Sequence, residues 1–252
     1  MMAKPTTLHY FRLLIAFLVI LILSIFASAQ SSELAPGWRI ISAEEILSEC
    51  RSSGDDLSFT DRSGEEWELI TDATDPDITN PGEFSFYPMS ESVVRSVILE
   101  LAPEIRSNLA CTIYILPYPR RGLVRSSCDG RAIYLSPGVR QYSPPIIHCI
   151  LCHEVGHLVH RQLVPKAAPD FWPRYRRLRG LENCDLFHTS SLHGNQPEEI
   201  FAEDFRKLFG TPVGRVVQVT EISSAPAVQT RSHVKALIWD LFRTPIGRLL
   251  SE

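Results

Sequence analysis

The sequence predicts a mixed α+β fold, in which helices and strands follow one another without the regular strand-helix-strand repeat of parallel α/β proteins. Two short runs rich in β-branched and aromatic residues, at 112–116 and 132–135, predict strands. Three longer segments, at 90–101, 144–163 and 197–209, carry apolar residues at helical spacing. Hydrophobic residues make up 44% of the chain, a share typical of a globular protein with a buried core.

The first 29 residues have the pattern of a signal peptide. Lys4 and Arg12 precede an apolar run at 13–23 that continues at 25–26, and Ala27-Ser28-Ala29 matches a cleavage site. We therefore expect cleavage after Ala29 and a secreted or cell-envelope protein. An uncleaved membrane anchor is the alternative, because the run with its flanks approaches the roughly 20 residues that span a bilayer.

The charge balance argues against nucleic acid as a partner. The chain has 25 Lys and Arg against 29 Asp and Glu, a formal net charge of -4, and so lacks the basic excess that binds phosphate backbones. Neither a repeat nor a low-complexity tract divides it. We expect one domain after the signal peptide, with an N-terminal part at 30–110 and a core at 111–252.

The N-terminal part is predicted to consist of helices and loops. Ser42 begins a capping box for a short helix that ends near Cys50. The segment 52–82 is rich in Asp, Ser, Gly and Thr, which predicts mostly loop with a short hairpin at 67–70. Ser90 precedes the helix at 90–101, and Pro103 is expected to kink or restart it.

The core begins with the two predicted strands, which a basic loop separates. Ser143-Pro144 supplies the N-cap and first residue of a helix that runs to about Leu163. The proline-containing segment 163–196 is predicted to be irregular. Pro197 opens the next helix, and a strand at 216–222 and a closing helix at 231–242 are expected to follow.

Six cysteines lie beyond the signal peptide, at positions 50, 111, 128, 149, 152 and 184. An even number in an exported chain favours disulfide bonds. Cys111 and Cys128 flank the two predicted strands and are the preferred pair. Cys149 and Cys152 have the spacing of a redox or metal pair, but their helical setting favours a structural disulfide or buried thiols.

The sequence His153-Glu154-Val155-Gly156-His157 has the H-E-x-x-H pattern and lies within the predicted helix at 144–163. Residues four apart share one helix face, so both imidazoles reach one zinc ion, and Glu154 points to where a water molecule binds. Zinc lowers the pKa of water to roughly 7, and Glu154 as general base passes the proton to a leaving amine. The missing side chain of Gly156 is expected to make room at the metal.

The predicted helix at 197–209 offers a third ligand. Glu199 and Glu203 lie on one face of it, with the small Ala202 beside them, so that the two helices approach closely. We expect Glu199 to bind zinc and Glu203 to contact a ligand histidine. Glu203 is the alternative ligand.

Together, the residues 153–157 and the run Glu199-Ile200-Phe201-Ala202-Glu203-Asp204-Phe205-Arg206 resemble the catalytic domain of anthrax toxin lethal factor and its relatives. The resemblance covers roughly 111–209. It implies a zincin-like metallopeptidase fold, with a small mixed sheet packed on an active-site helix and a second ligand-bearing helix. It also implies one zinc ion on His153, His157 and Glu199, Glu154 as the base, and a protein or peptide substrate bound along an edge strand at 132–135.

This chain departs from that family in one respect. The family has a tyrosine shortly before the second helix that donates to the oxyanion, whereas this chain has Leu192-His193-Gly194 there. His193 and Tyr175 are the candidate transition-state donors that replace it.

Two other hypotheses remain open at this stage. In one, the protein is a non-enzymatic secreted binding protein in which zinc only joins two helices, with a protein side chain in the fourth coordination position. In the other, it is a peptidase anchored by an uncleaved signal, which is the one case in which a membrane is a partner.

Overall fold

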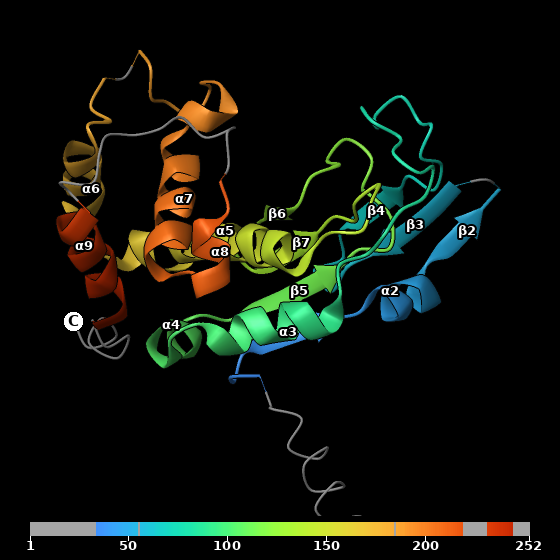
Figure 1. Ribbon diagram of the computed structural model, residues 1–252, viewed down its shortest axis with the longest axis horizontal. Helices are drawn as coiled ribbons and strands as arrows, with labels where there is room; N and C mark the ends of the chain where they lie inside the picture. The colour runs from blue at the N-terminus through green and yellow to red at the C-terminus, as the bar shows by residue number, and fades with distance from the viewer. Residues whose placement is uncertain (1–33, 55, 184, 219–230, 244–252) are drawn as a thin grey trace, which may run out of the picture. The chain divides into compact units, whose positions relative to one another are not determined.

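The protein is described here by a computed structural model that covers residues 34–54, 56–183, 185–218 and 231–243 (Figure 1). Residues from Ala35 onward belong to one compact unit, and the mixed α+β class is confirmed. The predicted signal peptide lies outside the described residues. Among these residues, no helix combines the length and the apolar content that a bilayer crossing requires.

The central sheet has four strands in the order β1-β5-β7-β6: β1 (Trp38–Ile41), β5 (Cys111–Ile115), β7 (Ala132–Leu135) and β6 (Ser127–Cys128). Strands β1, β5 and β7 are parallel, and β6 runs antiparallel to β7. Ser127 pairs with Tyr134 and Cys128 with Ile133. The prediction that 132–135 forms the edge strand is therefore wrong, because the short β6 occupies that edge.

A second, antiparallel sheet contains β2 (Arg51–Ser53), β3 (Asp56–Thr60) and β4 (Glu66–Leu69). The hairpin predicted at 67–70 is confirmed in part, because β4 covers most of these residues. The prediction that 52–82 is mostly loop is wrong for the first half of this segment, which contains β3 and parts of β2 and β4. Phe59 and Leu69 join a buried cluster with Tyr114 and Tyr134 of the central sheet. These few apolar residues hold the small sheet against the large one.

A buried arginine reinforces the junction between the two sheets. The guanidinium carbon of Arg120 lies 4.2 Å from the ring centre of Trp67 and 4.1 Å from that of Tyr134. Cation–π attraction of this kind is strongest where water is excluded. Tyr134 also donates to Asp61 Oδ2 at 2.5 Å, which ties the turn after β3 to the central sheet.

Most of the predicted helices are present, with bounds close to those expected. They are α2 (Ala43–Glu49), α3 (Glu91–Glu100), α4 (Pro103–Asn108), α5 (Pro144–Leu163), α7 (Pro197–Phe209) and α9 (Arg231–Arg243). The Oγ atom of Ser42 accepts the N–H of Glu45 and so caps α2 as predicted. Pro103 restarts the chain as α4, where its missing N–H costs no hydrogen bond.

The segment 163–196 is more regular than predicted. It contains α6 (Phe171–Arg179) and the short 3-10 helices η1 (Val164–Lys166) and η2 (His193–Asn195). Pro173 lies in the first turn of α6, where a proline is tolerated, and Gly180 ends the helix in the left-handed conformation. The strand expected at 216–222 is wrong for its described part, since α8 (Pro212–Val216) ends there and Val217–Gln218 are irregular; 219–222 lie outside the described residues.

The cysteines of the described segments, at positions 50, 111, 128, 149 and 152, are free thiols, and Cys184 lies outside. Strands β5 and β6 lie on opposite sides of β7. The Cα atoms of Cys111 and Cys128 are therefore at least two strand spacings, about 10 Å, apart, which exceeds the reach of a disulfide. The preferred pairing is wrong for this reason. Burial raises the pKa of the Cys128 thiol to about 12.

Helix α5 is the central element of the packing. It contacts β6 and β7 of the sheet and also α3, α7 and α8. At Gly156 the backbones of α5 and α7 come together, because a Cβ atom there would lie 2.6 Å from Ala202 Cα and 2.7 Å from its carbonyl oxygen. Gly156 therefore makes room for α7, and not for the metal as the sequence suggested.

Replacing Gly156 with Ala should lower stability, although alanine is the better helix former by about 1 kcal/mol. Overpacking against a backbone costs about 1–3 kcal/mol, which corresponds to a decrease of roughly 2–10 °C in Tm. Thermal unfolding measures this decrease. Ala236→Gly, at an exposed position of α9, is the control, because it measures the difference in helix propensity between alanine and glycine without a change in packing. An unchanged or higher Tm for Gly156→Ala would contradict the close approach.

Candidate metal centre

Helix α5 presents the two histidines of the H-E-x-x-H pattern on one face. Ser143 precedes the helix and two prolines occupy its first positions, which suits residues whose N–H groups would have no helical partner. His153 and His157 follow two and three turns later, and their Nε2 atoms are 3.2 Å apart. The i,i+4 spacing therefore brings two imidazole nitrogens close together, as predicted.

Helix α7 brings Glu199 to the same point. Its Oε2 atom lies 3.1 Å from His153 Nε2 and 3.3 Å from His157 Nε2. Within the described parts of the chain, these three residues are the group of ligand-type side chains close enough to share a metal ion. The structure thus brings together the three residues that the sequence predicts.

The three ligand atoms fit the size of a zinc ion. Separations of 3.1, 3.2 and 3.3 Å match the edges of a tetrahedron, and the centre of such a tetrahedron lies about 2 Å from each corner, the usual Zn–N and Zn–O bond length. Two imidazoles and one carboxylate are also a donor set that zinc accepts in enzymes. The residues present therefore fit a zinc ion.

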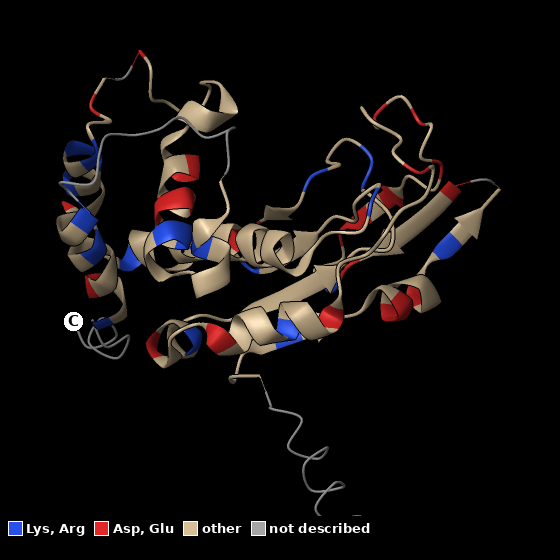
Figure 2. Ribbon diagram, viewed as in Figure 1, with Lys and Arg blue, Asp and Glu red and all other residues tan. Residues whose placement is uncertain are grey.

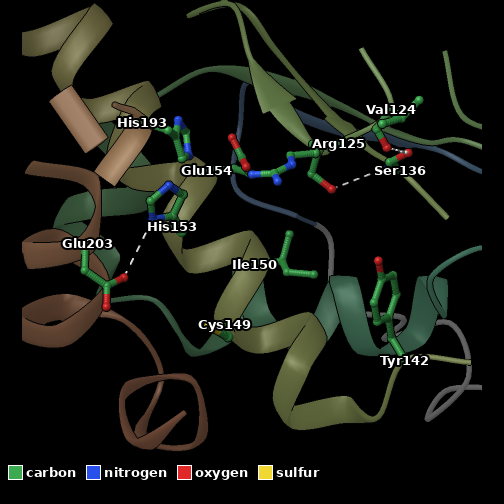
Figure 3. Close-up of a pocket in the computed structure, with 11 residues that line it drawn as sticks. Val124, Arg125, Ser136, Tyr142, Cys149, Ile150, His153, Glu154, His193 and Glu203 are labelled. Atoms are coloured by element: carbon green, nitrogen blue, oxygen red, sulfur yellow. Dashed lines mark hydrogen bonds and ion pairs between the residues drawn. The ribbon is translucent and has the colours of Figure 1, made fainter. Parts of the chain in front are cut away.

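Glu203 lies behind the ligands and not among them. Its Oε2 atom is 3.7 Å from His153 Nδ1 (Figure 3), whereas Glu199 contacts the other ring nitrogen, Nε2. Arg206 binds both carboxylate oxygens, at 2.6 and 2.7 Å, and Lys207 Nζ lies at 3.1 Å. These cations outweigh the effect of burial and lower the pKa of Glu203 to about 2. Glu203 is thus placed to orient His153, and the alternative of a ligand role is not favoured.

The histidines and carboxylates of the cluster shift one another's pKa. Burial opposes a charge on His153, but its hydrogen bonds to Glu199 and Glu203 prevail and raise its pKa to about 9. The same contacts outweigh burial at Glu199 and hold its pKa well below the ordinary value. A metal ion would replace a proton as the positive charge that these atoms surround.

Glu154 is buried beside the histidines, and burial raises its pKa. Its Oε2 atom has no hydrogen-bond partner among the residues that the structure describes, although buried carboxylate oxygens are normally satisfied. The side chain borders a cavity of about 390 Å³ that also touches His153 and His193. An oxygen in this position is suited to bind a water molecule beside the cluster.

The two candidate transition-state donors, His193 and Tyr175, lie in different surroundings. His193 lies in η2, is half exposed, and places Nε2 3.3 Å from Glu199 Oε2 at the cavity wall. Tyr175 is fully buried in α6, where its hydroxyl donates to Asp204 Oδ2 at 2.8 Å and its ring stacks on Trp172. The expectation for Tyr175 is therefore wrong, because its hydroxyl is committed to the interface of α6 and α7.

Three further residues at the cavity have no sequence signal of their own. Arg125 precedes β6, Ser136 directly follows β7, and Tyr142 precedes α5. Figure 3 shows them arranged around the same space as Glu154. Their place depends on how the loop before β6 meets the end of β7, a long-range contact that no local pattern encodes.

Comparison of the chain with models of protein families, with curated proteins and with solved structures finds no match. The donor set and its geometry are therefore the main support for a function.

Changing Glu199 to Gln should weaken zinc binding by about tenfold or more, since an amide oxygen carries no charge to offset the ion. Competition with a zinc-binding dye measures the affinity. Glu198→Gln is the matched control, because Glu198 is the adjacent acidic residue in the first turn of α7 and lies outside the cluster. Equal affinities for the two variants would remove Glu199 from the ligand set.

Proposed function

We propose that this chain is a zinc-dependent metallopeptidase of the zincin type, which cleaves protein or peptide substrates. The observation that carries the proposal is the convergence of His153, His157 and Glu199 from two helices, with the buried Glu154 beside them at a cavity. A site that only stabilises a fold does not need a carboxylate with an unpaired oxygen next to the metal.

Zinc, when bound at these residues, supplies a Lewis acid that polarises a carbonyl oxygen and lowers the pKa of water toward neutrality. Glu154 reaches water in the cavity and accepts its proton as the water oxygen attacks the carbonyl carbon of the peptide bond. The same carboxyl group then gives that proton to the nitrogen of the departing amine as the C–N bond breaks. Glu203 keeps the His153 ring in place through its Nδ1 side.

His193 is proposed to stabilise the negative charge that develops on the carbonyl oxygen. It is half exposed at the cavity wall and near the ligands, and so reaches a substrate without a rearrangement of the core. A single donor of this kind contributes about 10²–10³-fold to kcat.

The substrate is proposed to bind in an extended conformation at the sheet edge nearest to the cavity. That edge is β6 with the preceding residues Val124–Ser126, which border the cavity. Unpaired main-chain groups at an edge recognise an extended peptide without regard to most of its side chains. We further propose that the protein is exported and acts outside the cytoplasm, after removal of residues 1–29.

One observation favours a second candidate function. Since His193 Nε2 lies only 3.3 Å from a ligand oxygen, a small shift would let it occupy a fourth coordination position. The protein would then be a secreted binding protein that zinc stabilises, without catalytic activity. The activity of the Glu154→Gln variant and the zinc affinity of the His193→Ala variant distinguish the two candidate functions.

Glu154→Gln should abolish peptide hydrolysis, by at least about 100-fold, because the amide cannot accept the proton. Zinc content, measured by elemental analysis, should stay at one ion per chain. Hydrolysis is followed with a mixture of fluorogenic peptides. Activity equal to that of the wild type would exclude Glu154 as the base, and an inactive wild type would favour the binding protein.

His193→Ala should lower kcat by about 10²–10³-fold and leave zinc affinity unchanged if the side chain acts on the transition state. A loss of zinc affinity would instead identify His193 as a fourth ligand. Steady-state kinetics and dye competition on the same preparation give both quantities.

A further inference from the structure

A second cavity lies between helices α3, α4, α7, α8 and α9, where α4 packs beside α9 (Figure 1). Its volume is about 640 Å³, which falls in the range of roughly 300–1,000 Å³ that is typical of sites for small organic ligands. Its described lining includes Ile105, Phe209, Arg215, Lys235 and Trp239.

This second cavity is separate from the candidate metal centre. None of its described lining residues borders the cavity beside Glu154. Phe209 lies at the opposite end of α7 from Glu199, about 15 Å away along the axis at the usual rise per residue. A ligand in the second cavity therefore meets a different set of side chains from a substrate at the metal ligands.

Part of the lining is apolar and aromatic. Ile105 is fully buried and Phe209 nearly so, and Trp239 is half-buried. The rings of Phe209 and Trp239 stack with their centres 5.8 Å apart and their planes at 10°. A ligand that covers these rings removes apolar surface from water, which favours binding.

Two cations and one carboxylate complete the lining. Arg215 Nε donates to the carbonyl oxygen of Gly210 at 2.7 Å, and Lys235 Nζ lies 5.9 Å from the centre of the Phe209 ring. Among the residues that the structure describes, neither cation forms an ion pair with a carboxylate. Glu100 supplies the negative charge, so that one positive charge is in excess.

The excess positive charge lies toward α8 and α9. Figure 2 shows that α3 and α4 carry both acidic and basic residues, whereas basic residues prevail on α9. This helix has Arg231, Lys235 and Arg243 against Asp240. An anionic group is therefore attracted to the side of the cavity where Arg215 and Lys235 lie, and is repelled from the side of Glu100.

These features together indicate the chemistry of the ligand. Guanidinium and ammonium groups bind a carboxylate through charge-assisted hydrogen bonds, and an aromatic or aliphatic body suits the stacked rings. A single negative charge balances the lining. A second one would lie closer to Glu100 without a cation to offset it.

We propose that the second cavity binds a small organic carboxylate, whose charged group contacts Arg215 and Lys235 and whose apolar body covers Phe209 and Trp239. The inference goes beyond the proposed peptidase function and does not rest on it. The ligand is an amphipathic monoanion with an aromatic ring or a short aliphatic chain.

Displacement of the fluorescent dye anilinonaphthalene sulfonate, itself an aromatic monoanion, tests the site in the purified protein. The competitors are decanoate and phenylbutyrate, each compared with its uncharged primary amide. Each acid should displace the dye at a concentration at least about tenfold lower than its amide, because hydrogen bonds between charged groups are stronger than those of neutral ones. The acids should also raise Tm, since a ligand that binds only the folded state stabilises it.

Substitutions in the lining assign the binding to this cavity. Arg215→Gln and Lys235→Gln should each weaken binding of the acids by about two- to fivefold, because solvent partly screens exposed cations. The double variant should bind acid and amide alike. Ala236→Leu adds a side chain to the lining and should weaken both. Arg243→Gln is the matched control, because Arg243 lies on the same helix but outside the lining, and it should bind as the wild type does.

The candidate metal centre is a competing place for a carboxylate, because zinc also binds carboxylate oxygens. Measurements with and without added zinc separate the two, and binding in the second cavity should be equal under both conditions. Binding that requires zinc, or acids that bind no better than their amides, would overturn the inference. So would affinities that the double variant leaves unchanged, or the absence of both dye displacement and a change in Tm.

A second copy of the chain is the other possible occupant of this cavity. A dimer that is detected by sedimentation and dissociated by Ala236→Leu would identify that copy as the occupant, and would likewise overturn the inference. A monomer that binds the acids supports it. Peptide hydrolysis, whether present or absent, decides only the proposed function.

Discussion

The backbone contact between α5 and α7 is the constraint on which the candidate metal centre depends. Histidine and glutamate side chains are short, so three of them meet at one point only if the helices that carry them nearly touch. Gly156 lies between the two histidines in the sequence, and its missing Cβ allows the backbone of Ala202 to approach. Glu199, one turn before Ala202, then reaches both imidazole nitrogens.

The acidic run at the start of α7 is mostly buried and neutralised, and is not a solvated surface. Glu203 is bound by Arg206, and Asp204 is bound by Arg179 of α6. Glu199, Glu203 and Asp204 thus each have a different partner, a histidine pair for Glu199 and an arginine for each of the other two. Removing charged groups from water is costly unless each is paired, so the order of these acidic residues fixes the rotation of α7 relative to its neighbours.

The sequence predicted the parts of the site that depend on local spacing. The positions of His153 and His157 follow from helical periodicity, and so does the shared face of Glu199 and Glu203. The same reasoning located the long helices. For α7, Pro197 and Gly210 gave the bounds almost without error, because helix ends have side-chain signals of their own.

The features that the sequence did not predict depend on contacts between distant segments. Strands β1 to β4 have three to five residues each, too few for a clear period, and each is stabilised by a partner strand rather than by its own pattern. Tyr175 has the chemistry of a donor, but its place is decided by the packing of α6 on α7, where its ring meets that of Phe201 edge-on. The cavity wall at 124–126 depends in the same way on Ser136.

Arg206 links the candidate metal centre to the chain that follows α7. This fully buried guanidinium group binds Glu203 and, in addition, the carbonyl oxygens of Gly214 and Val217. The turn of α8 is thereby fastened to the carboxylate behind His153 at a single residue. A shift of the backbone at Gly214 or Val217 would therefore reach the imidazole of His153 through Arg206 and Glu203.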